Sequence, residues 1–133
     1  MGRLINRFRP YARILLAIWA FIIIALAIIP DLPVLKIGGK PLPIRLDYPV
    51  HFMEHTLLAF LAIIAFVTSR SDIRVFRITL LFLILFAVFA EMLHIVIPFR
   101  SFEYKDLALN ISGIFIGTLI AICAMRDKSR RSV

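Results

Sequence analysis

The stretch FRITLLFLILFAVFAEMLHIVI, residues 76–97, holds only four polar side chains among its 22 residues. A transmembrane helix takes about 20 predominantly apolar residues, since a lone segment in hydrocarbon can satisfy its backbone N–H and C=O groups only as a helix. Three more apolar blocks of similar length occupy residues 11–29, 50–68 and 107–125. The sequence therefore predicts an all-α, four-helix transmembrane bundle.

The composition of the whole chain supports the same class of protein. Of its 133 residues 62% are hydrophobic and 18% are charged, and the mean hydropathy is +0.96. Soluble domains are typically about 45–50% apolar, so a soluble domain of this size would leave much apolar surface in water. No internal repeat or low-complexity linker divides the chain. We expect one domain over residues 1–133.

The loop at residues 30–49 is rich in Pro and Gly. Gly38 and Gly39 suggest a tight turn, and we expect Pro41 and Pro43 to prevent a regular strand or helix. The N-terminus resembles a signal peptide, with arginines before an apolar run. That run is longer than a signal core of about 7–15 residues, so we interpret it as a retained membrane helix.

Basic residues are gathered at alternate ends of the four apolar blocks. The chain has 16 Lys and Arg against 8 Asp and Glu, a net charge of +8. By the positive-inside rule, these clusters place both termini and the middle loop in the cytoplasm, with a basic tail at 126–133. No platform of aromatic and basic residues supports nucleic-acid binding. The clusters contain eleven of the sixteen basic residues: Arg3, Arg7, Arg9 and Arg13; Arg70, Arg74 and Arg77; and Arg126, Lys128, Arg130 and Arg131.

Polar residues of the second apolar block share one helical face. His51, Glu54 and His55 follow Asp47 at i+4, i+7 and i+8. On a period of 3.6 residues these positions lie on one side, provided that the helix includes Asp47.

The third and fourth blocks repeat this arrangement at the same end. Glu91 and His94 are three residues apart near the end of the third block. We expect Asp106 to begin the fourth helix as its capping residue, with Asn110 one turn later. The stripe continues with two small residues, Gly113 and Gly117, which let another helix approach closely.

Burying these groups in lipid is costly, about 2.5–3.5 kcal/mol for a charged residue near the bilayer centre. Three helices that each carry such a stripe at one end should turn the stripes toward each other. We therefore expect a buried polar pocket that opens to the extracytoplasmic side. Its predicted ligand-binding residues are Asp47, His51, Glu54, His55, Glu91, His94, Arg100, Asp106 and Asn110.

Two segments resemble the VanZ-like membrane proteins, and the resemblance covers residues 47–120. They are DYPVHFMEHTLLAFL, residues 47–61, and EMLHIVIPFRSFEYKDLALNISGIFIG, residues 91–117. The sequence departs from the family pattern at Tyr48, His94 and Phe99, where we expect Lys, Gln and Gly. The resemblance implies a multi-pass protein of the bacterial inner membrane that acts in the cell envelope. The founding member is linked to resistance to the glycopeptide teicoplanin. Glu54 and His55 stand where Glu-Tyr or Ala-Tyr is common in the family. The matching positions are Asp47, His51, Glu91, Pro98, Arg100, Asp106, Asn110, Gly113 and Gly117.

Several functions fit this pattern. The first is a non-enzymatic protein that binds an anionic amphiphile, such as a lipid-linked cell-wall intermediate or a lipoglycopeptide, with Arg100 holding the anion. The second is an enzyme acting on a lipid-linked phosphate or saccharide, with His51, Glu91 or Asp106 as general base. The third is a small helper subunit that packs on a larger membrane protein through Gly113 and Gly117.

Two structural alternatives remain beside these functions. Arg100, Asp106 and Asn110 also suit a purely structural network of hydrogen bonds and ion pairs. Histidines spaced by four residues and a Glu-x-x-His pair are spacings that metal sites use. They leave a metal as an alternative, although we expect no cofactor. These spacings involve His51, His55, Glu91 and His94.

Overall fold

The computed structural model describes residues 2–29, 36–37, 40–41, 47–68, 72–98 and 101–126, with side chains from residues 7–29, 48–68, 72–98 and 101–125. All the helices of this described part are long and apolar enough to cross a membrane, which confirms the predicted four-helix transmembrane fold. The elements are α1 (Gly2–Ile28), β1 (Lys36–Ile37), β2 (Lys40–Pro41), α2 (Asp47–Phe66), α3 (Ile73–Val96) and α4 (Tyr104–Arg126).

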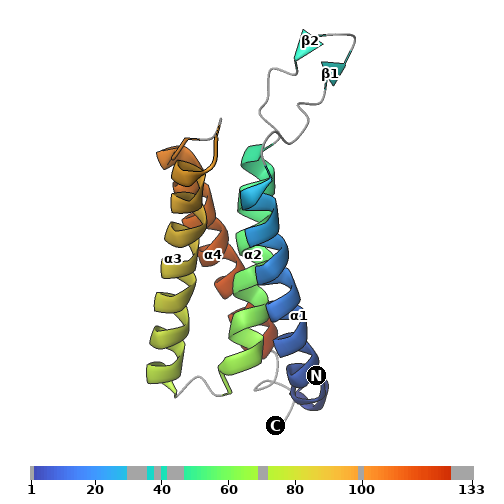
Figure 1. Cartoon of the computed structure of the whole chain (residues 1–133). Helices are drawn as coiled ribbons and strands as arrows, with labels where there is room; N and C mark the ends of the chain where they lie inside the picture. Colours follow the sequence, from blue (N-terminus) through green and yellow to red (C-terminus); the bar gives the residue numbers. More distant parts are fainter. Residues whose placement is uncertain are drawn as a thin grey trace.

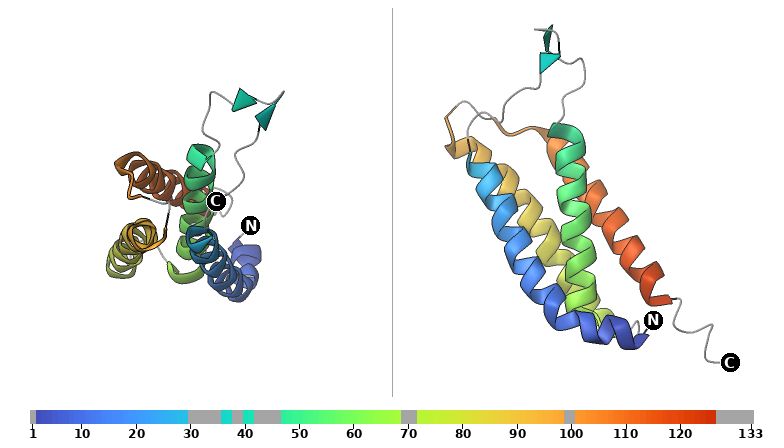
Figure 2. Two further views of the ribbon diagram at one scale, coloured as in Figure 1. Left: turned by 45° about the horizontal axis from the view of Figure 1, so that its top comes forward. Right: turned by 90° about the vertical axis from the view of Figure 1, so that its right-hand side faces the viewer.

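Consecutive helices run in opposite directions along the bundle (Figure 1). The start of α1, the end of α2, the start of α3 and the end of α4 lie together at one end, which we call the basic end. The paired strands lie beyond the opposite end, which we call the hairpin end (Figure 2). The start of α1 and the end of α4 therefore lie at the same end of the bundle. Their cytoplasmic location remains a prediction from the charges.

The strands correct one expectation about the loop between α1 and α2. β1 and β2 pair antiparallel, with Lys36 opposite Pro41 and Ile37 opposite Lys40. The expectation that Pro41 prevents a regular strand is therefore wrong. Proline lacks an N–H group but is tolerated in an edge strand, where that donor is not needed. The expected turn at Gly38 and Gly39 and the role of Pro43 lie outside the described residues.

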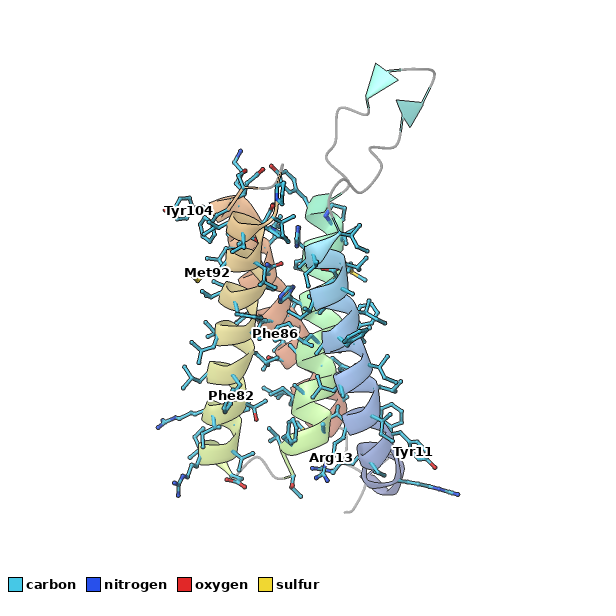
Figure 3. All side chains as sticks on the ribbon, in the orientation of Figure 1. Tyr11, Arg13, Phe82, Phe86, Met92 and Tyr104 are labelled. Carbon is cyan, nitrogen blue, oxygen red and sulfur yellow. The ribbon has the colours of Figure 1, made fainter. Side chains whose placement is uncertain are left out.

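The second helix, α2, is at the centre of the packing. It contacts α4 most extensively and also packs on α1 and α3. Small buried side chains, Ala59 and Ala62 on α2 and Ala87 and Ala90 on α3, allow these helices to approach. Large apolar side chains such as Phe82 point outward from the bundle, as expected of groups that face lipid (Figure 3). The helix that carries four of the predicted site residues is thus held from several sides.

Gly113 and Gly117 of α4 lie directly against the backbone of α2. A Cβ atom on Gly113 would overlap the carbonyl oxygen of Phe52, and a Cβ on Gly117 would overlap the carbonyl oxygen of Thr56. Backbones at this separation leave no room for a side chain. The glycine groove, which the helper-subunit hypothesis assigned to a partner protein, is therefore filled by α2 of the same chain.

Arginines of α1 bind the end of α2 at the basic end. The Arg9 Nη1 atom donates to the hydroxyl of Thr68 at 3.0 Å, and the Arg13 Nε atom donates to the carbonyl of Ala65 at 3.4 Å. The last carbonyl groups of a helix have no partner within it, so a cation there is favourable. These arginines link α1 to α2 in addition to acting as predicted topology signals.

We expect Arg13→Met to lower the free energy of unfolding in detergent by about 1 kcal/mol, the usual contribution of one hydrogen bond. The matched control is Arg77→Met, which removes a positive charge from an exposed position near the start of α3, at the same end. Thermal unfolding in one detergent measures both. Equal midpoints for the two variants would show that the contact with Ala65 contributes nothing.

Candidate functional site

A group of polar side chains is enclosed at the hairpin end of the bundle. It is drawn from separate helices, and its carboxylate, imidazole and amide groups are largely or fully buried. We call this group the polar cluster. It consists of His51, Glu54 and His55 on α2, Glu91 and His94 on α3, and Asp106 and Asn110 on α4.

His51 is the residue that joins the helices of the cluster. Its Nε2 atom lies 3.9 Å from Oδ2 of Asp106 on α4, and its Nδ1 atom lies 4.0 Å from Oε2 of Glu54 on its own helix. Its ring centroid is 6.1 Å from that of His94 on α3, in an edge-on arrangement. One imidazole thus contacts acidic and aromatic groups of all the helices that form the cluster.

Glu91 connects the end of α3 to the start of α4. Its Oε1 atom accepts the backbone N–H of Glu103 at 3.0 Å and lies 3.3 Å from Nδ1 of His94. Glu103 immediately precedes α4, where backbone N–H groups have no partner within the helix. A buried carboxylate is well placed there because it supplies an acceptor and a negative charge at a helix N-terminus.

His55 lies one turn below His51 and is held in a defined orientation. Its Nδ1 atom bonds to the carbonyl of His51 at 3.1 Å. A carbonyl can only accept, so Nδ1 carries the proton, and Nε2 of the neutral ring is an acceptor. The ring lies 6.4 Å from that of Phe86, which points into the bundle from α3 (Figure 3). His55 therefore occupies the inner floor of the cluster.

Asp106 has a different position from the one expected. The helix begins two residues earlier, at Tyr104, and the backbone N–H groups of Asp106 and Leu107 bond to the carbonyl of Glu103. The expectation that Asp106 begins α4 is therefore wrong, although it does lie in the first turn. Its carboxylate instead turns toward His51, because this face of α4 packs on α2.

Some predicted site residues fall outside the described part. Arg100, between α3 and α4 in the sequence, is not among the described residues, so its role as the anion ligand remains a prediction. Asp47 begins α2, as the shared helical face requires, but its side chain is not described. Within the described ranges, no group of three or more His, Cys, Asp or Glu side chains has an arrangement suited to a metal ion.

Two contacts near the cluster were not expected from the sequence. The indole N–H of Trp19 donates to the carbonyl of Glu54 at 2.9 Å, which ties α1 to the helix that carries the cluster. The backbone N–H of Glu103 binds Glu91. The contact of Glu103 could have been anticipated from the sequence, because backbone N–H groups just before a helix often need acceptors. The contact of Trp19 could not, because nothing in the continuous apolar run around Trp19 indicates a hydrogen bond.

An all-α bundle of membrane-spanning helices that encloses acidic and imidazole groups at one end is a multi-pass membrane protein with a candidate polar binding site. The profile of the VanZ/LLP1 family matches residues 43–125, which include α2, α3 and almost all of α4, so this chain belongs to that family. Comparisons with curated proteins and with solved structures found no match.

Proposed function

We propose that this VanZ/LLP1 protein binds the headgroup of an amphiphile in its polar cluster, at the extracytoplasmic face of the bacterial inner membrane. The observation that supports the proposal is the meeting of His51 of α2, Glu91 of α3 and Asp106 of α4 at one end of the bundle. Ionisable groups within membrane helices are costly and commonly mark a functional site. The cluster lies near the helix ends, which is the depth at which lipid headgroups meet a membrane protein.

The proposed ligand is an anionic amphiphile, such as a lipid-linked cell-wall intermediate or a lipoglycopeptide. Arg100 follows the end of α3 closely in the sequence, and its guanidinium suits a phosphate or carboxylate. The carboxylates and imidazoles of the cluster suit hydroxyl and amine groups of the same headgroup. Binding of this kind would connect the protein to teicoplanin resistance, the process associated with the founding member of the family.

Lipid analysis of the purified protein tests this proposal. We expect wild-type protein extracted from bacterial membranes to retain a specific amphiphile, and we expect Arg100→Ala and Asp106→Asn to reduce its amount at least about tenfold, a loss of about 1.4 kcal/mol. The matched control is Asp72→Asn at the basic end. Asp72 caps α3 through the N–H of Val75, and Asn caps equally well, so only a charge is removed.

The lipid analysis decides whether the polar cluster binds a ligand or only stabilises the fold. If Arg100→Ala and Asp106→Asn both retain the same lipids as wild type, the cluster is a structural network and the proposal is wrong. In cells, we expect the same two variants, but not Asp72→Asn, to lose any protection from teicoplanin that wild-type expression provides.

A second candidate function is hydrolysis or transfer of a lipid-linked phosphate or saccharide. It is favoured by the pairing of imidazole with carboxylate, between His94 and Glu91 at 3.3 Å and between His51 and Asp106 at 3.9 Å. Such pairs can take and return a proton during a reaction. Chemical change of the retained amphiphile on incubation with wild-type protein, abolished by Asp106→Asn, would identify an enzyme.

The third function, a helper subunit of a larger complex, needs a different surface from the one expected. Gly113 and Gly117 are covered by α2 within the chain. A variant at Gly117 therefore disturbs the fold itself and does not test partner binding.

A further inference from the structure

The floor of the polar cluster contains several acceptor atoms to which none of the described residues donates a hydrogen bond. They are Nε2 of His55, Oε2 of Glu91 and Oδ1 of Asn110, and no described residue forms a hydrogen bond with any of them. Each of these residues is only 1% exposed. A buried polar atom without a partner costs about 1–3 kcal/mol, so such atoms call for a bound molecule that supplies donors.

These residues belong to one region of the bundle. His55 is in electrostatic range of Glu91 across the interface between α2 and α3. The Cβ position of Gly113 lies 3.2 Å from the Cβ of His55, so α4 touches α2 at this level. Asn110 is one turn before Gly113 on the same face of α4. It lies between Gly113 and Asp106, and Asp106 is the residue that contacts His51. The three acceptors thus belong to neighbouring residues of α2, α3 and α4 in the interior of the bundle.

The chemistry of the floor selects a particular kind of group. A neutral imidazole nitrogen, a carboxylate oxygen and an amide oxygen all accept hydrogen bonds, and a carboxylate also attracts positive charge. A phosphate offers mainly acceptor oxygens and a negative charge, so it does not suit this floor. A hydroxyl offers one donor and no charge. A protonated primary amine offers three N–H donors and a positive charge.

We propose that the floor formed by His55, Glu91 and Asn110 binds the primary ammonium group of the amphiphile headgroup. This inference rests on the proposed function, because the same cluster holds the ligand, and it adds the chemical class. The ligand carries an amine that reaches the floor, while its acidic group stays at the rim. A headgroup with a quaternary amine, which has charge but no N–H, binds poorly.

Phospholipids that differ only in headgroup test the inference. The full-length protein in detergent is titrated with ethanolamine, choline and glycerol phospholipids of the same acyl chains, and bound lipid is counted by native mass spectrometry. We expect the ethanolamine lipid to bind at least tenfold more tightly than the choline lipid, because only the former has N–H donors. We expect Glu91→Gln to remove most of this preference and Asp72→Asn to leave it unchanged.

Each result has a distinct meaning. Equal binding of the ethanolamine and choline lipids, or preference for the anionic glycerol lipid, overturns the ammonium site. Preference for the glycerol lipid leaves the proposed amphiphile site intact, whereas failure of all three lipids and of cell-derived lipids to bind would also reject that function. If Glu91→Gln does not fold, the comparison of the ethanolamine and choline lipids on wild-type protein still decides the question.

Discussion

Gly117→Leu is expected to separate α2 from α4 and to prevent the bundle from forming a stable core. The nearest atoms to a side chain at this position belong to the backbone of α2, namely the carbonyl group of Thr56, and to Cβ of Ala59. A flexible side chain could move aside, but a helix backbone moves only as a whole. We expect a loss of at least about 3 kcal/mol in the free energy of unfolding, the upper part of the range for overpacking a core.

Unfolding in detergent and elution from a size-exclusion column measure the effect. Ala108→Leu is the matched control, because Ala108 lies on the same helix but on its exposed face. We expect the control to behave as wild type and Gly117→Leu to aggregate or unfold at a much lower temperature. Wild-type stability of Gly117→Leu would mean that the two helices do not meet at this glycine.

Glu91→Ala is expected to disrupt both the fold at the hairpin end and the binding of ligand. The substitution removes the acceptor of the Glu103 N–H group just before α4 and the carboxylate beside His94 in the polar cluster. The loss of a buried acceptor costs about 1–3 kcal/mol for each interaction removed, so we expect a loss on the order of 3 kcal/mol in the free energy of unfolding. The ligand should be lost as well, because the acidic acceptor on the floor is gone.

Comparison with Glu91→Gln separates these two effects. Glutamine keeps an oxygen that can accept from Glu103 but removes the negative charge. We therefore expect Glu91→Gln to unfold within about 1 kcal/mol of wild type, as for a volume-conserving change, and still to lose bound amphiphile. Unfolding curves and lipid analysis on the same preparations check this. Full retention of the amphiphile by Glu91→Gln would show that the charge is not needed for binding.

The hydrophobic blocks of the sequence by themselves determined the class of fold. Each block is long enough to cross a bilayer, and a segment in lipid must be helical regardless of its neighbours. For the same reason the faces of the helices were predictable: His51, Glu54 and His55 share a side of α2 because the helical period is local. The family match over residues 43–125 agrees with the motifs seen in the sequence.

The sequence predicted that the polar stripes of α2, α3 and α4 face one another, but the tertiary structure alone decided which individual groups pair across the helices. That α2 fills the glycine groove at Gly113 and Gly117, that Arg13 binds the end of α2, and that His51 reaches Asp106 all depend on how each helix is rotated and crossed against the others. Periodicity specifies which side of a helix is polar or small, but it does not say which neighbour occupies that side. The partner of each stripe follows from the packing of the whole bundle, because a backbone can approach only where the facing helix has no side chain.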